Sequence, residues 1–389
     1  MKKIVILTAT RAEYGLLKPV IVGLLKDPYY DARVAVTGMH LSPEFGYTVR
    51  EIEEDNIPID KKIEIILSSD THVAISKAMG LAMISFSEYF EECKPDALLV
   101  LGDRFETLAV CASATNARIP IFHIHGGEAT EGLIDEAIRH SITKMSYLHF
   151  TSTETYRKRV IQMGEAPDRV FNVGAIGVEN ALNVPLMNQC DLEESLGFKL
   201  GDKYAVGTFH PVTLENNTAE NQVKELLYAL DKHKDIMYLF TKANADTDGR
   251  VINEIFLEYE KKNDNFHIVD SLGMKRYLSA LKNARFVIGN SSSGLLEAPA
   301  FHISTIDIGD RQKGRVAGLS VIHCEPKTEL IDKAITKALD SEFLKGISDM
   351  PNPYGEGMAS QKILSAIKEF FEQDKINIKK KFYDLCFEV

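Results

Sequence analysis

The sequence predicts two Rossmann-like, doubly wound α/β domains facing a cleft, and three observations carry this prediction. Short runs of β-branched and apolar residues alternate with longer amphipathic stretches, as in chains that build parallel sheets. These short runs are apolar throughout, which is typical of strands covered on both faces. The alternation begins again near residue 204, and 389 residues are enough for two cores. Ligands of such folds bind at the carboxyl ends of the strands, so the cleft is the expected site.

The first half, residues 1–185, is expected to form the N-terminal domain. Its apolar runs predict strands at Ile4–Thr8, Arg33–Thr37, Ala97–Leu101, Ile119–His123, Leu148–Thr151 and Val170–Val173. Between them, apolar residues at helical spacing predict helices at Leu16–Lys26, Asp70–Cys93, Glu106–Asn116 and Asp135–Lys144.

The second half, residues 186–375, is expected to form the C-terminal domain. It opens with a polar segment, Leu186–Asp202, whose shortage of β-formers favours a linker. Strands are predicted at Tyr204–Thr208, Met237–Thr241, His267–Val269, Phe286–Gly289, Thr305–Ile308 and Ser320–Ile322. Helices are predicted at Ala219–His233, Val251–Lys261, Lys275–Lys282, Glu329–Asp340 and Met358–Lys375, followed by a basic, exposed tail over residues 376–389.

Composition excludes several classes of protein. The chain has 45 Lys and Arg against 56 Asp and Glu, a formal charge of −11, and no Trp. An acidic surface repels nucleic acid, although a few cations in a cleft still bind a small anion. The five scattered cysteines, none in CxxC spacing, indicate reduced thiols in a cytoplasmic protein. No apolar run approaches the roughly 18 residues of a membrane span, so no membrane partner is expected.

Signatures of common cofactors are missing from the sequence. No GxGxxG follows the first strand, which leaves nicotinamide and flavin binding without support. No HExxH occurs, and His123 and His125 lack a second His pair with ligand spacing. We therefore expect neither a cofactor nor a metal.

Two polar clusters follow the first and third predicted strands of the first half. Arg11 lies directly after the first strand, where it can meet an anion beside a helix N-terminus or simply cap a surface loop. Asp103 and Arg104 follow the strand Ala97–Leu101. Asp103 fits a catalytic carboxylate in the crevice, and the competing interpretation is a helix N-cap.

A third cluster supplies further groups for proton transfer. In an extended segment, His123 and His125 would project to one face. Glu128, Asp135 and Glu136 follow, and with Asp103 they provide several carboxylates. For Asp135 and Glu136 the alternative is a solvated first turn of a helix.

The second half carries two clusters that suit an anionic ligand. His210 follows its first strand and can act as acid, base or phosphate donor, or be satisfied by backbone groups. Serines at a helix start present N–H groups and hydroxyls to a phosphate. Glu297 can accept hydrogen bonds from ribose hydroxyls, and Arg311 can neutralise the charge of a diphosphate. The candidate binding residues here are Asn244, Ser291, Ser292, Glu297 and Arg311. The cleft therefore suits a nucleotide-sugar.

Together these clusters resemble the UDP-N-acetylglucosamine 2-epimerase family, and most closely its hydrolysing branch. The matching stretches are TRAEYG (10–15), VTGMHL (36–41), GDRFE (102–106), HIHGGE (123–128), IDEAIRHSITK (134–144), FHPVT (209–213), GNSSSG with Glu297, and GDRQKGR (309–315). The resemblance implies a glycosyltransferase-B-type fold, a homodimer or homotetramer, and no metal or nicotinamide requirement. It also implies loss of UDP and the C2 proton to give 2-acetamidoglucal, followed by hydration to N-acetylmannosamine for sialic-acid synthesis.

The resemblance also suggests roles for individual residues. Asp103 is similar to the family's catalytic carboxylate, and Asp135 or Glu136 to a further one. Some relatives carry Glu where this chain has His125, so His125 or Glu128 is the other candidate for proton transfer. Contacts to the nucleotide or diphosphate are implied for Arg11, Arg104, His210, Asn244, Ser291, Ser292, Glu297 and Arg311. Alternatives are a hydrolysing epimerase acting on another nucleotide-activated amino sugar, a glycosyltransferase, and a nucleotide-sugar sensor without catalysis.

Overall fold

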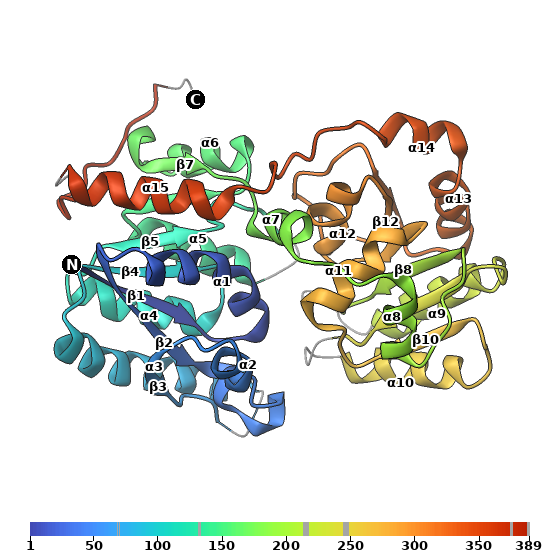
Figure 1. Ribbon diagram of the computed structural model, residues 1–389, viewed down its shortest axis with the longest axis horizontal. Helices are drawn as coiled ribbons and strands as arrows, with labels where there is room; N and C mark the ends of the chain where they lie inside the picture. Colours follow the sequence, from blue (N-terminus) through green and yellow to red (C-terminus); the bar gives the residue numbers. More distant parts are fainter. Residues whose placement is uncertain are drawn as a thin grey trace. The chain divides into compact units, whose positions relative to one another are not determined.

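The computed structural model describes residues 1–67, 69, 71–130, 134–212, 218–243, 249–373 and 376–386. The chain divides into two compact units. Unit 1 comprises Met1–Glu128, Asp135–Glu179 and Gly355–Val389, and unit 2 comprises Ala129–Ile134 and Asn180–Tyr354. Each unit is a parallel sheet covered by helices on both faces (Figure 1). The prediction of two Rossmann-like α/β domains is confirmed.

The sheet of unit 1 has seven strands within the described residues, in the order β3-β2-β1-β4-β5-β6-β7. Neighbouring strands pair in parallel, so their carboxyl ends lie at one edge. The strands are β1 (Lys2–Thr8), β2 (Tyr30–Thr37), β3 (Ile59–Ile63), β4 (Ala97–Leu101), β5 (Ile121–Ile124), β6 (Leu148–Thr151) and β7 (Val170–Asn172).

Helices bury apolar side chains against both faces of this sheet. One core joins β1 and β5 to α1 and α15, and the other joins β1 and β4 to α3 and α4. The helices of unit 1 are α1 (Arg11–Lys26), α2 (Val49–Glu54), α3 (His72–Cys93), α4 (Phe105–Asn116), α5 (Asp135–Met145), α6 (Glu154–Gln162) and α15 (Ala359–Glu372). Helix α7 (Ile176–Asn183) begins in unit 1 and ends in unit 2.

The sheet of unit 2 has six strands among the residues that the structure describes, in the order β10-β9-β8-β11-β12-β13. They are β8 (Tyr204–Thr208), β9 (Met237–Thr241), β10 (Phe266–Val269), β11 (Phe286–Gly289), β12 (Ser304–Ile308) and β13 (Val321–Cys324). Its helices are α8 (Gln189–Leu196), α9 (Ala219–Leu230), α10 (Gly249–Glu260), α11 (Gly273–Asn283), α12 (Ser293–Leu296), α13 (Thr328–Ala338) and α14 (Ser341–Ile347).

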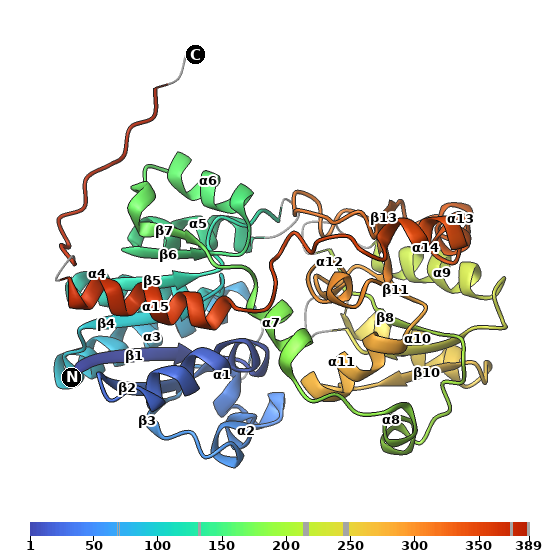
Figure 2. The same cartoon turned by 45° about the horizontal axis from the view of Figure 1, so that its top comes forward.

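The C-terminal helix corrects the expected domain boundary. We expected residues 186–375 to form one domain, but α15 packs on unit 1, to which the chain returns at Gly355 (Figure 2). The reason is burial: Ile363 and Ile367 of α15 are fully buried in the core that contains Ile4 and Leu17. The tail after α15 is therefore part of unit 1 as well.

One further expectation is wrong, and one strand was not predicted. The segment Leu186–Asp202 is not a bare linker, because it contains α8, whose Leu192 is buried in a core of unit 2. Strand β3 was not expected at all. Its residues Asp60, Lys61 and Lys62 are exposed, so this edge strand has no continuous apolar run.

Candidate active site

Asp103 and Arg139 form an ion pair at the carboxyl edge of the unit 1 sheet. Asp103 follows β4, and Arg139 lies on α5. Arg139 Nε donates to Asp103 Oδ2 at 2.9 Å, and Nη2 donates to the same oxygen. Arg139 has only 2 % of its side chain exposed, whereas Asp103 keeps 27 %, so the carboxylate is both fixed and accessible. The N-cap interpretation fails, because Arg104 is the N-cap residue of α4.

The same guanidinium also holds Glu136. Arg139 Nη1 donates to Glu136 Oε2 at 3.1 Å and to the backbone oxygen of Glu128 at 2.9 Å. Glu136 Oε1 lies 3.1 Å from His140 Nε2, one turn along α5. Burial, with a smaller effect of the neighbouring Asp103 carboxyl, raises the pKa of Asp135. Asp135 and Glu136 thus occupy the expected first turn of α5, but Glu136 is engaged with two neighbours.

His125 and Glu128 lie after β5 and are both almost fully buried. His125 Nδ1 is 3.6 Å from Glu128 Oε1, which accepts a hydrogen bond from Ser152 Oγ at 3.0 Å. His125 has a φ of +66°, so the segment is not extended there, and the expectation that His123 and His125 share one face is wrong. His123 instead contacts the backbone oxygen of Gly102 at 2.8 Å, and burial lowers its pKa to about 3.

Arg104 is flanked by two carboxyl groups that we did not select from the sequence. Arg104 Nε donates to Glu106 Oε1 at 2.8 Å, and Glu106 is fully buried. Glu13 accepts from the backbone amides of Ala9 and Thr10, at 2.8 and 3.2 Å. Burial raises the pKa of Glu13 to about 7, although Arg104 acts in the opposite direction.

The missed groups do have signals in the sequence. Thr10 and Glu13 have the spacing of a capping box at the start of α1, and the structure shows both of its bonds. Arg139 lies four residues after Asp135, on the same helix face. Arg11, by contrast, is exposed at the first position of α1, and its Nη1 is 3.9 Å from Glu51 Oε1.

In unit 2, Asn290 ties together the loops that follow β8 and β11. Its side-chain amide donates to the backbone oxygen of His210 and accepts from the His210 N–H, both at 2.7 Å. Gly289 is needed here, because a Cβ at this position would come within 2.0 Å of the Thr208 carbonyl oxygen. Arg311 Nη1 donates to the backbone oxygen of Asn290 at 3.2 Å, which brings the loop after β12 to the same place.

This arrangement leaves His210 uncharged. Burial, with a smaller effect of Arg311, lowers the pKa of His210 to about 3. A neutral imidazole can donate or accept a hydrogen bond near pH 7, but it holds no proton to give as an acid.

The serine cluster differs from the expected helix start. Helix α12 is a single turn, Ser293–Leu296, so its dipole is small. Ser292 is the N-cap residue, and Ser291 Oγ accepts from the Ser293 N–H at 3.4 Å. Glu297 follows the helix and is half-buried. Asn244 lies outside the described residues.

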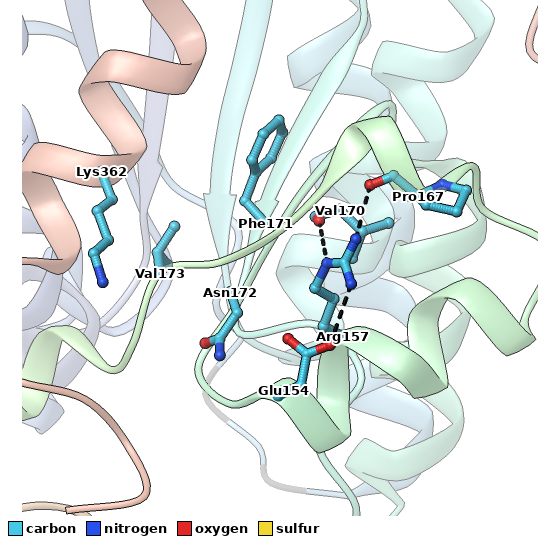
Figure 3. A pocket seen from close by; sticks show the side chains of 8 residues that line it. All are labelled: Glu154, Arg157, Pro167, Val170, Phe171, Asn172, Val173 and Lys362. Atoms are coloured by element: carbon cyan, nitrogen blue, oxygen red, sulfur yellow. Dashed lines mark hydrogen bonds and ion pairs between the residues drawn. The ribbon is translucent and has the colours of Figure 1, made fainter.

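A cavity of about 370 Å³ lies elsewhere on unit 1, beside β7 (Figure 3). Arg157 lines it but donates to the backbone oxygens of Val170 and Pro167 and to Glu154. None of the candidate residues named above lines this cavity. Among the described residues, no group of three or more His, Cys, Asp or Glu is placed to hold a metal ion, and no described helix is long and apolar enough to cross a membrane.

Comparison with known proteins identifies the family. The profile of the UDP-N-acetylglucosamine 2-epimerase family matches residues 23–368. The chain is 42 % identical to the GDP/UDP-N,N'-diacetylbacillosamine 2-epimerase (hydrolyzing) of Campylobacter jejuni, covering 99 % of both chains. It is also 42 % identical to the polysialic acid biosynthesis protein P7 of Escherichia coli, covering 99 % of this chain and 98 % of that protein.

Solved structures show the same fold. MnaA from S. aureus, solved with UDP, has a TM-score of 0.80 at 19 % identity and covers 99 % of this chain and 100 % of its own. The expected glycosyltransferase-B type of fold, with two parallel-sheet α/β domains, is confirmed. The match of the profile and of both relatives over nearly the whole chain shows that this protein belongs to the UDP-N-acetylglucosamine 2-epimerase family.

Proposed function

We propose that this protein is a hydrolysing 2-epimerase that converts UDP-N-acetylglucosamine and water to UDP and N-acetylmannosamine. The observation that carries the proposal is the Asp103 carboxylate, fixed by buried Arg139 yet still accessible at the sheet edge. A sugar C2 proton is weakly acidic, so its removal requires a base held in one orientation. Asp103 meets this requirement.

The reaction has two steps. In the first, a carboxylate takes the C2 proton, the C2 electron pair forms the C1–C2 double bond, and the bond from C1 to the diphosphate oxygen breaks. UDP leaves with the electron pair of the broken C1–O bond. In the second, water adds across the double bond of 2-acetamidoglucal. Its oxygen bonds to C1, and a proton enters C2 from the face opposite to the one that the first proton left, which inverts C2. The products are UDP and N-acetylmannosamine.

A second group must deliver the proton to C2. Asp135 suits this role, because burial and the neighbouring Asp103 carboxyl favour its protonated form. Glu136 is bound by Arg139 and lies beside His140, and Glu128 accepts from Ser152. Those contacts favour a fixed orientation over a change of protonation. His125, beside Glu128, is the remaining candidate for the transfer.

We assign nucleotide binding to the unit 2 residues and the two arginines of unit 1. Arg311 meets the charge that develops on the departing diphosphate, and hydroxyls of Ser291 and Ser292 add hydrogen bonds. His210, being neutral, contributes a hydrogen bond and not an acid. Glu297 binds the ribose, and Arg11 and Arg104 bind phosphate oxygens.

A second substrate is favoured by a specific observation. The Campylobacter jejuni relative, 42 % identical over 99 % of the chain, is named for N,N'-diacetylbacillosamine. This diacetamido sugar undergoes the same change at C2. The alternative function is therefore a hydrolysing 2-epimerase of UDP-N,N'-diacetylbacillosamine.

One experiment separates these functions. The enzyme is incubated in D2O with each nucleotide-sugar in turn, and the products are analysed by NMR and mass spectrometry. Free N-acetylmannosamine deuterated at C2 supports the first proposal, and a deuterated 2-epimer of the diacetamido sugar supports the second. Release of UDP without deuterium at C2 would indicate a transferase, and binding without turnover a sensor, and either would overturn both proposals.

A further inference from the structure

The chain continues after α15 as an extended tail (Figures 1 and 2), and its contacts assign this tail to unit 1. The Asn377 N–H donates to Tyr147 Oη at 3.0 Å, and the Tyr383 N–H donates to the backbone oxygen of Gly164 at 2.9 Å. The Phe382 ring lies directly on Gly164, where a Cβ would come within 2.3 Å of it. The tail is thus attached at residues far before it in the sequence.

Lys380 makes the central contacts of this tail. Its Nζ donates to the backbone oxygens of Lys144 and Ser146, at 2.7 and 2.8 Å. These carbonyls belong to the end of α5 and the residue after it, which lack partners within the helix. A lysine ammonium at this position satisfies them and interacts favourably with the helix dipole.

The same ammonium pairs with a buried carboxylate. Lys380 Nζ lies 2.9 Å from each oxygen of Glu165, whose side chain is fully buried. Lys144, in the last turn of α5, donates to Glu165 Oε1 at 2.5 Å, and His149 Nε2 lies 3.2 Å from Oε2. Burial alone would raise the pKa of Glu165, but His149 and the two lysines outweigh it and lower the pKa to about 2. A buried, charged Glu165 therefore links the tail to α5.

Helix α5 is also the helix whose first turns carry Asp135, Glu136 and Arg139. It has 11 residues, which corresponds to a length of about 16 Å. A helix this short moves as a rigid rod, so a displacement at its C-terminal end displaces its first turn too. We propose that Lys380 is a positioning residue, which holds α5 so that Arg139 and the acidic groups stay aligned with Asp103. The effect on catalysis rests on the function proposed above, whereas the effect on α5 does not.

The test compares Lys380→Met, Lys380→Arg and Lys381→Met. Lys381 is the matched control, since it is the next residue of the tail and is exposed. Lys380→Met is expected to lower kcat roughly tenfold, because small misplacements of catalytic groups are costly. It should leave KM and UDP affinity unchanged and speed hydrogen exchange of the α5 amides about fivefold. Lys380→Arg keeps the charge and the donors and should restore most of kcat and of the protection of α5.

Three results would overturn the proposal. The first is Lys380→Met with wild-type kcat and wild-type exchange in α5. The second is a rise in exchange spread evenly over unit 1, which would show a general loss of stability. The third is an equal effect of Lys381→Met, which would show that only the charge of the tail matters. If the wild-type protein turns over neither sugar, the proposed function fails, and the exchange comparison alone decides the role of Lys380.

Discussion

Replacing Glu13 with glutamine is expected to stabilise unit 1 at pH values above 7. Glu13 is buried at the start of α1 and accepts from the backbone amides of Ala9 and Thr10. Glutamine keeps an acceptor for these bonds and is also suited to this capping-box position. The change therefore removes the carboxylate charge and leaves the local structure in place.

The magnitude follows from the pKa. Burial raises the pKa of Glu13 from an ordinary 4.5 to about 7, which corresponds to roughly 3 kcal/mol. Between these two values the folded chain keeps a proton that the unfolded chain releases, so the free energy of unfolding falls as pH rises. Above pH 7 both states are ionised and the loss is constant. Between pH 5 and pH 8.5 the wild-type protein should lose about 2–3 kcal/mol more than the variant.

Urea unfolding at the two pH values measures this difference. Pulsed hydrogen exchange with mass spectrometry reads the midpoint from α1 peptides, so that unit 1 is followed separately from unit 2. With an m-value of about 2 kcal/mol/M, the advantage of Glu13→Gln should grow by about 1 M between pH 5 and pH 8.5. The exposed Glu88 on α3 provides the control, Glu88→Gln, which should show no such growth. An advantage of Glu13→Gln that is the same at both pH values would refute the reasoning.

Three substitutions test the proposed roles. Asp103→Asn should lower kcat on the order of 10²- to 10⁴-fold, because a positioned base contributes about that much to the rate. The UDP affinity, measured by calorimetry, should not change, and full activity of this variant would contradict the assignment. Arg139→Lys should lower kcat on the order of 10²-fold with unchanged UDP affinity, because one ammonium cannot replace donors at Nε, Nη1 and Nη2 of a guanidinium. A kcat within the error of wild type would show that Asp103 needs no such support. Arg311→Ala should raise the UDP Kd about 10- to 100-fold, since hydrogen bonds to charged groups contribute ~1.5–3 kcal/mol. The control is Lys313→Ala, which should leave the Kd unchanged because Lys313 is exposed and lies beside Asp310. Equal Kd values for the two variants would exclude the role of Arg311.

The central strands could be predicted because burial on both faces leaves a plain sequence pattern. Strands β4 and β8 begin and end at the predicted residues, and every residue in them is buried. Strand β3 has only one neighbour, so three of its five residues face solvent and the pattern disappears. The packing of α15 on unit 1 depends on which apolar surface it covers, and an amphipathic pattern by itself does not specify that surface.

The candidate site could likewise be predicted only in part. Asp103 could be identified because it directly follows a predicted strand, and topology then places it at the sheet edge. Its partner Arg139 is 36 residues further along the chain, and the pairing depends on how α5 packs beside α4 and β5. The orientation of His125 depends on its left-handed backbone conformation. Histidine rarely adopts this conformation, so it could not be predicted from the sequence.

The carboxyl groups that we assign to proton transfer all belong to unit 1. Unit 1 gathers the carboxyl groups of Asp103, Asp135 and Glu136 around the buried guanidinium of Arg139, an arrangement that suits proton transfer. The arginines assigned to the phosphates are Arg311 of unit 2, which lies close to the neutral His210, and Arg11 and Arg104 of unit 1. Proton transfer at C2 is the same for a sugar with one acetamido group or with two. The choice between such sugars therefore falls to residues that contact C4 and C6. Substitutions there should change which sugar reacts, while deuterium still enters at C2.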